Sequence, residues 1–107
     1  METLEHMDMN EFMKKIVKGT YVLFFTADWC PDCNFIKPAM PEIESDFSQT
    51  KFIAINRDDN IELAADFGIM GIPSFVVMQD GQEKARLVNK KRKTKEEVES
   101  FLTDALK

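Results

Sequence analysis

YVLFFTADWCPDC, residues 21–33, joins a nearly continuous apolar run to the only two cysteines of the chain, Cys30 and Cys33. Residues 21–27 are apolar, β-branched or aromatic almost throughout, which predicts a strand buried on both faces. A helical pattern begins at Pro31, so we expect Cys30 at a helix N-terminus. Unpaired backbone N–H groups and the helix dipole favour negative charge there, and they stabilise a thiolate.

The spacing of the two cysteines favours thiol–disulfide exchange. Cys33 lies one helical turn beyond Cys30, close enough to close a disulfide with it. A structural zinc site normally takes four protein ligands, whereas the chain offers two cysteines and one histidine, His6. A purely structural disulfide is the other alternative, but a ring this short would constrain the unfolded chain little.

Length and composition predict a single domain over residues 1–107. The chain is 44% hydrophobic and 31% charged, which is ordinary for a soluble globular protein. No segment resembles a secretory signal or approaches the roughly 18 apolar residues of a membrane span, so we expect no membrane association. A chain that starts at Met1 is then expected in the cytoplasm, where cysteine pairs are more often catalytic than structural.

The charges are segregated along the chain. Residues 28–66 hold nine acidic and three basic residues, whereas residues 84–95 hold seven of the fourteen lysines and arginines. The formal net charge of −5 argues against nucleic acid as a partner. The local cluster of positive charge, which we call the basic run, comprises Lys90, Lys91, Arg92, Lys93 and Lys95.

Periodicity and turn signals predict four helices and four strands. The Asp80-Gly81 pair is a strong hairpin signal, and Asp8 and Thr94 have capping-box spacing to Glu11 and Glu97. The order of elements implies an α/β fold with helices on both faces of a mixed sheet, which has four strands, or five if a short strand precedes Asp8. We expect helices at 8–18, 31–47 (kinked at Pro38), 60–67 and 94–106, and strands at 21–27, 51–56, 74–78 and 84–88.

Two separated motifs resemble those of the thioredoxin family over nearly the whole chain. The first is Ala27-Asp28-Trp29-Cys30 with Cys33, and the second is Gly71-Ile72-Pro73-Ser74-Phe75; Pro38 and the Asp80-Gly81 turn match as well. The resemblance implies a thioredoxin fold and a thiol–disulfide oxidoreductase that reduces protein disulfides. It assigns Cys30 as the exposed nucleophile and Cys33 as the resolving thiol.

The resemblance also implies a substrate-binding surface. The Ile72-Pro73 bond is expected to be cis and to face the disulfide, where the Ile72 backbone can pair with an extended substrate segment. Trp29 is expected to flank the site, although it could instead be a core aromatic, and Pro73 alone would also fit the start of a strand. Substrate contacts are therefore expected from Trp29, Pro31, Asp32, Ile72, Pro73 and Lys91.

Cofactor and partner expectations follow from the same resemblance. No cofactor or metal should be bound, because the redox group is the Cys30–Cys33 disulfide itself. Electrons should come from NADPH through a thioredoxin reductase, a flavoprotein, and the chain should be a monomer that acts on disulfide-containing proteins, acidic ones among them. Two other functions remain open: a narrow reductase of cystine or of glutathionylated or persulfidated proteins, and a protein-binding module with the thioredoxin fold.

Four residues depart from the family pattern. Thioredoxins normally carry Gly-Pro between the cysteines, where this chain has Pro31-Asp32. Phe24 replaces a buried aspartate that serves the resolving thiol, and Ala54 replaces the lysine that normally faces this aspartate. We therefore expect slow resolution of mixed disulfides. Candidates for deprotonating Cys33 are Asp32, Asp28, Asp58 or water.

The basic run has two interpretations. The thioredoxin fold places the loop before the last helix beside the cis-proline and the cysteines, with Lys91 where the family usually has a small residue. The run could be a solvated loop that adds solubility. It could also be an electrostatic collar that stabilises the Cys30 thiolate and attracts acidic partners or anionic small thiols.

Overall fold

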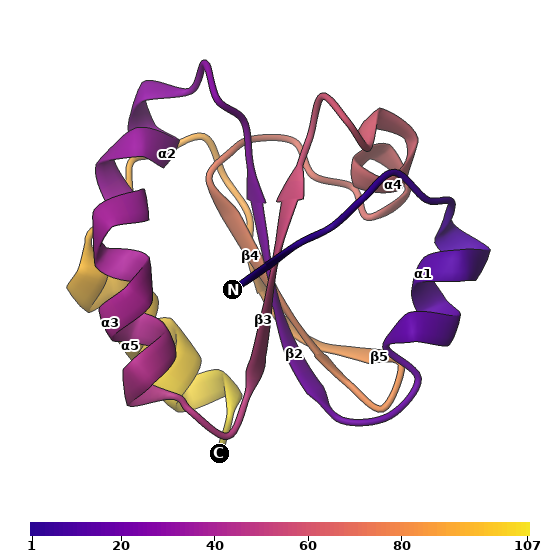
Figure 1. Cartoon of the computed structure of the whole chain (residues 1–107). Helices are drawn as coiled ribbons and strands as arrows, with labels where there is room; N and C mark the ends of the chain where they lie inside the picture. Colours follow the sequence, from indigo (N-terminus) through magenta and orange to yellow (C-terminus); the bar gives the residue numbers. More distant parts are fainter.

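The computed structural model describes residues 1–107 and has one five-stranded mixed sheet with strand order β1-β3-β2-β4-β5 (Figure 1). β1 and β3 run parallel to their neighbours, whereas β4 is antiparallel to both β2 and β5. The fold is the expected thioredoxin fold, and the short N-terminal strand makes a fifth. The strands are β1 Glu2–Thr3, β2 Thr20–Thr26, β3 Lys51–Asn56, β4 Ser74–Gln79 and β5 Gln82–Leu87.

Helices cover both faces of the sheet. Helices α1 and α4 lie on one face, and α2, α3 and α5 lie on the other (Figure 1). Side chains of β2 point alternately to the two faces of the sheet. Leu23 and Phe25 belong to the core that includes residues of α1 and α4, and Val22 and Phe24 belong to the core that includes residues of α2, α3 and α5. The helices are α1 Met9–Lys15, α2 Pro31–Ile36, α3 Met40–Asp46, α4 Ile61–Asp66 and α5 Lys95–Ala105.

The helical region after Cys30 is interrupted at the predicted place. A 3₁₀ turn over Lys37–Ala39 separates α2 from α3, with Pro38 inside it. Proline lacks the N–H that would continue the α-helical ladder, which explains the interruption. The first helix ends at Lys15 rather than at the expected Lys18, because residues 16–19 form a turn in which Gly19 takes φ +100°.

Caps and turns agree with the sequence signals. Capping boxes join Asp8 to Glu11 and Thr94 to Glu97. In the β4–β5 hairpin, Asp80 and Gly81 take φ +50° and +81°, as a tight two-residue turn requires. These local interactions set the starts of α1 and α5 and the turn of the hairpin. β5 of the hairpin leads into the loop of residues 88–94, which lies beside the site described below.

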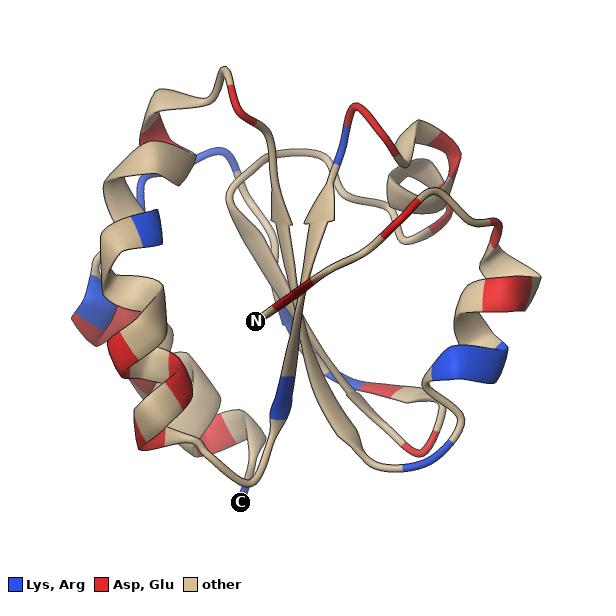
Figure 2. Cartoon of the chain, viewed as in Figure 1, with Lys and Arg blue, Asp and Glu red and all other residues tan.

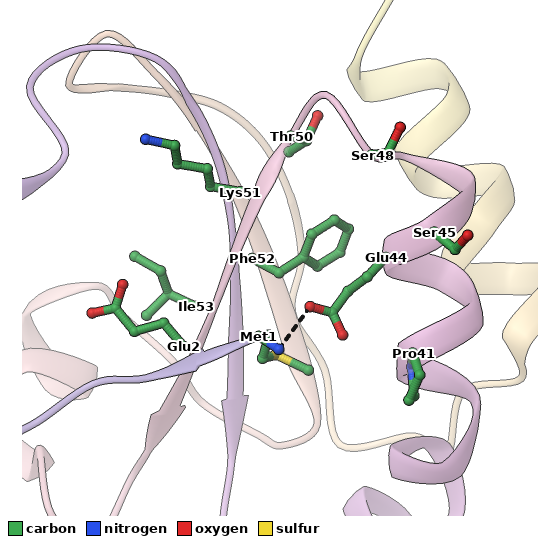
Figure 3. A pocket seen from close by; sticks show the side chains of 10 residues that line it. All are labelled: Met1, Glu2, Pro41, Glu44, Ser45, Ser48, Thr50, Lys51, Phe52 and Ile53. Carbon is green, nitrogen blue, oxygen red and sulfur yellow. Dashed lines mark ion pairs between the residues drawn. The ribbon is translucent and has the colours of Figure 1, made fainter.

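The largest surface pocket lies far from the cysteines, between the start of β3 and α3 (Figure 3). The side chain of Glu44, from α3, points across the pocket and forms an ion pair with the amino group of Met1 at 2.9 Å. Neither cysteine lines this pocket. Separately, none of the helices is long and apolar enough to cross a membrane.

Candidate active site

Cys30 is the N-cap of α2, and Pro31 occupies the first helical position. The backbone N–H of Cys33 donates to the Cys30 sulfur at 3.2 Å, so the sulfur takes the place of an oxygen cap. Proline suits the first position because no N–H is needed there. The helix start thus directs a backbone donor at Cys30 and places Cys33 one turn deeper, with both thiols free.

A loop from the other half of the chain faces the dithiol. The Ile72-Pro73 bond is cis, as the resemblance implies, and it immediately precedes β4. The Cys30 thiol donates to the carbonyl oxygen of Ile72 at 3.8 Å. β2 and β4 are neighbours in the sheet, so the cysteine motif and the proline motif meet at one end of it.

Cys30 is less exposed than expected. It is 4% exposed and Cys33 is fully buried, because neighbouring residues form a shallow pocket of about 310 Å³ around Cys30. A substrate sulfur must therefore enter this pocket to reach the nucleophile. The lining residues are Trp29, Cys30, Pro31, Asp32, Arg57, Met70, Gly71, Ile72 and Lys90.

Trp29 lies on the surface beside the cysteines and is not a core aromatic. It is 58% exposed, and its indole N–H donates to the Asp58 carboxylate at 2.8 Å. The guanidinium of Arg57 lies over its ring, 5.6 Å from the centroid. These contacts fix the indole as one wall of the pocket.

The three carboxylates considered as proton acceptors for Cys33 have other partners. Asp58 binds the Trp29 indole, and Asp32 pairs with the Nε of Arg92 at 2.9 Å. Asp28 has a fully solvated carboxylate whose nearest cation is Lys37, at 3.9 Å. None of the three forms a hydrogen bond with the resolving thiol.

The basic run, for which the sequence left both a solvated loop and an electrostatic collar open, is not uniformly exposed. The loop before α5 passes beside α2 (Figure 2), but Lys93 is only 1% exposed. Its ammonium donates to Asn89 Oδ1 at 2.8 Å and to the Lys91 carbonyl at 2.6 Å. Lys91, predicted to contact substrate, is exposed but does not line the pocket, which Lys90 does instead.

Gly71 allows the loop before α5 to approach the proline motif. A Cβ at Gly71 would lie 2.7 Å from the carbonyl carbon and oxygen of Asn89 and 2.6 Å from Cγ of Lys90. Any side chain there would push this backbone away, so a glycine is required. The close approach places Lys90 at the rim of the Cys30 pocket.

The sequence of the chain is similar to those of known proteins. The Thioredoxin family model matches residues 3–104. The chain belongs to the thioredoxin family. Thioredoxin of Mycoplasma genitalium is 33% identical over 78 residues, which cover 73% of this chain and 76% of its own length. Thioredoxin H-type 1 of tobacco is 34% identical over 87 residues, with 79% and 69% covered.

Solved structures agree on the fold. Thioredoxin of Fasciola hepatica superposes with a TM-score of 0.81 at 24% identity and covers 98% of this chain and 99% of its own. Mitochondrial thioredoxin 3 of Saccharomyces cerevisiae gives a TM-score of 0.82 at 21% identity, with 97% and 94% covered. These structures support the fold, and the family relatives described above identify the chain as a thiol–disulfide oxidoreductase.

Phe24, at the position where the family pattern predicts a buried aspartate, lies in the apolar core. Phe24 stacks on Phe75, with ring centroids 5.1 Å apart, so the position of the family's buried carboxylate is filled by apolar packing. Burial raises the pKa of Cys33 to about 11, helped by its contact with Cys30, while the nearby polar groups of Thr26 and Ala27 lower it. At neutral pH, Cys33 is therefore a neutral thiol and a poor nucleophile.

Two pocket residues, Arg57 and Met70, were not predicted from the sequence, whereas Lys90 belongs to the basic run that one interpretation placed around the thiol. Arg57 directly follows β3, and Met70, 79% exposed, precedes the proline motif. Two features of the sequence could have indicated these residues. Arg57 follows the end of a predicted strand, and Met70 is next to Gly71 of the proline motif. The structure has no group of three or more His, Cys, Asp or Glu side chains that could hold a metal ion.

Proposed function

We propose that the chain reduces protein disulfides through its dithiol. The Cys30 thiolate attacks one sulfur of the substrate disulfide, the substrate S–S bond breaks, and the departing thiolate takes a proton. The Cys33 thiolate then attacks the Cys30 sulfur, which releases the second substrate thiol and leaves a Cys30–Cys33 disulfide. The observation that carries the proposal is the Cys30 sulfur, held between the Cys33 N–H and the Ile72 carbonyl at the floor of a pocket.

Regeneration of the dithiol needs two electrons from outside the chain. We propose NADPH, acting through a thioredoxin reductase, because this is what membership of the family implies. Function as a single-domain monomer in the cytoplasm belongs to the same proposal. The test is NADPH oxidation by host thioredoxin reductase with insulin and, separately, with cystine. Turnover with cystine alone would favour the narrow reductase, and no turnover with either would favour the binding module.

The assignment of the two thiols predicts selective labelling. Limited alkylation of the reduced protein with iodoacetamide should label Cys30 first, because Cys30 lines the pocket whereas Cys33 is buried and has a raised pKa. Peptide mapping after partial reaction measures the ratio of the two products. Faster labelling of Cys33 would reverse the assigned roles.

The pocket favours substrates with acidic residues beside their disulfide. Arg57 and Lys90 both line it, and neither has a carboxylate within 4.0 Å, whereas Arg92 is already paired with Asp32. Two unpaired cations at the entrance would attract acidic segments and speed their association. This supports a preference for acidic protein substrates within the wider reductase function.

Removing these two charges should slow reduction of an acidic substrate. In the Arg57→Gln/Lys90→Gln variant, we expect kcat/KM for a disulfide peptide flanked by glutamates to fall about fivefold at low salt, mainly through KM. The loss should shrink as ionic strength rises. A peptide flanked by glutamines is the control and should change little. Equal losses for both peptides would contradict a charge preference.

A further inference from the structure

Asp32 is the one acidic residue among those that line the pocket around Cys30. It is the second residue of α2, directly after Pro31, and its side chain is 34% exposed. A bare carboxylate in this wall would repel an acidic substrate segment, because like charges side by side disfavour binding. The charge of Asp32 therefore opposes the preference for acidic substrates that Arg57 and Lys90 create.

Arg92, from the loop before α5, supplies a compensating charge. Its Nε donates to Oδ1 of Asp32 at 2.9 Å. Its guanidinium also lies over the ring of Phe35, 4.4 Å from the centroid, which adds a cation–π attraction. Asp32 and Phe35 are three residues apart on α2, so one guanidinium contacts neighbouring side chains of the same helix. Arg92 does not line the pocket, and it therefore acts on the pocket through Asp32.

The fold of the loop holds Arg92 in place. Lys93, the next residue, is buried, and its ammonium donates to Asn89 Oδ1 at 2.8 Å and to the Lys91 carbonyl at 2.6 Å. The backbone N–H of Lys91 donates to the same Asn89 oxygen at 2.9 Å. These bonds order the backbone on both sides of Arg92. A side chain on an ordered loop loses less conformational entropy when it pairs, which favours its contact with α2.

The pair is too exposed to contribute much to stability. The Arg92 side chain is 54% exposed, and exposed ion pairs add little to the free energy of unfolding. Its consequence is electrostatic, since a paired carboxylate repels an approaching anion less than a bare one does. Arg92 can therefore be replaced without unfolding the chain, and the effect on substrates can be measured separately.

We propose that Arg92 is a specificity-determining residue of the Cys30 pocket. It neutralises Asp32 and so lets the pocket accept acidic segments beside the substrate disulfide. Arg57 and Lys90 supply the attraction, and Arg92 removes the repulsion that would offset it. Arg92 acts through Asp32 and need not touch the substrate. The inference rests on the reductase function and the acidic preference proposed above.

Single-turnover reduction of two disulfide peptides tests the inference without a reductase. One peptide is flanked by glutamates and the other by glutamines, and the ratio of their rate constants measures the charge preference. In Arg92→Gln at low salt, we expect this ratio to fall about fivefold, because a bare Asp32 then faces the glutamates. In an Asp32→Asn background, the same change should lower the ratio by less than about twofold, since no carboxylate remains to be uncovered.

Matched variants separate pairing from general charge and from loss of structure. Arg92→Lys keeps a cation near Asp32 and should restore most of the ratio. Lys91→Gln removes the same charge from the neighbouring residue, which has no carboxylate partner, and should lower the ratio by less than about twofold. Equal falls from Arg92→Gln in the two backgrounds, or from Lys91→Gln and Arg92→Gln, would overturn the inference. Failure of the parent protein to reduce either peptide would instead overturn the reductase function, and this role with it.

Discussion

Replacing Cys33 with serine should stop turnover and leave the protein joined to its substrate. Cys30 can still attack, because its pocket and the Ile72 carbonyl are untouched. No second thiol remains to break the mixed disulfide, so NADPH-coupled reduction of insulin should fall by at least about a thousandfold. Mass spectrometry of the reaction should find a covalent adduct at Cys30.

Cys30→Ser is the matched control for this experiment. It retains the buried Cys33 but loses the thiol that lines the pocket, so neither turnover nor an adduct is expected. In contrast, equal adduct yields from the two variants would mean that Cys33 can be attacked directly. That result would contradict the order of steps proposed for the dithiol.

The second large effect is expected on stability, at Phe24. Phe24 is almost fully buried, and its ring stacks on Phe75 in the core beneath α2, α3 and α5. Phe24→Asp restores the family's carboxylate but removes this packing and buries a charge without its lysine, since Ala54 stands where that lysine would be. We expect a loss of roughly 4–6 kcal/mol in the free energy of unfolding at neutral pH, measured by urea denaturation.

The pH dependence of that loss has a definite sign. Burial raises the pKa of the new carboxyl above its unfolded value of about 3.9, so the cost of the charge is absent at low pH and grows as pH rises. Phe24→Leu is the control, with lost packing but no new charge, and its smaller loss should not depend on pH. A difference below about 1 kcal/mol between the two variants at neutral pH would contradict the account.

Much of the fold could be predicted because its signals are local. The apolar run before Ala27, the Asp80-Gly81 turn and the two capping boxes each act within a few residues, and all are present in the structure. The end of α1 was wrong by three residues, because the turn that replaces its last part depends on Gly19 contacting Asp80, far away in the sequence.

The site could be predicted only in part. Both cysteine positions and the cis bond follow from compact motifs, but the pocket also needs Arg57, Met70 and Lys90 from three separate loops. Lys93 shows the limit most clearly. In the sequence it is one of several cations in an exposed run, and only the folded loop, with carbonyl groups turned inward, makes its burial possible.

The strand order of the sheet also affects the order in which parts of the chain can fold. The β4–β5 hairpin pairs two strands that are joined by a two-residue turn, and it can close early at little entropic cost. β2 must instead find Val77 and its neighbours on β4, more than fifty residues away, and such non-local pairing limits the rate of folding. Cys30 follows β2 and Ile72 precedes β4, so the nucleophile meets its carbonyl partner only after this slow step. During synthesis, the site around the dithiol therefore cannot form until the last third of the chain, which contains β4, has been made.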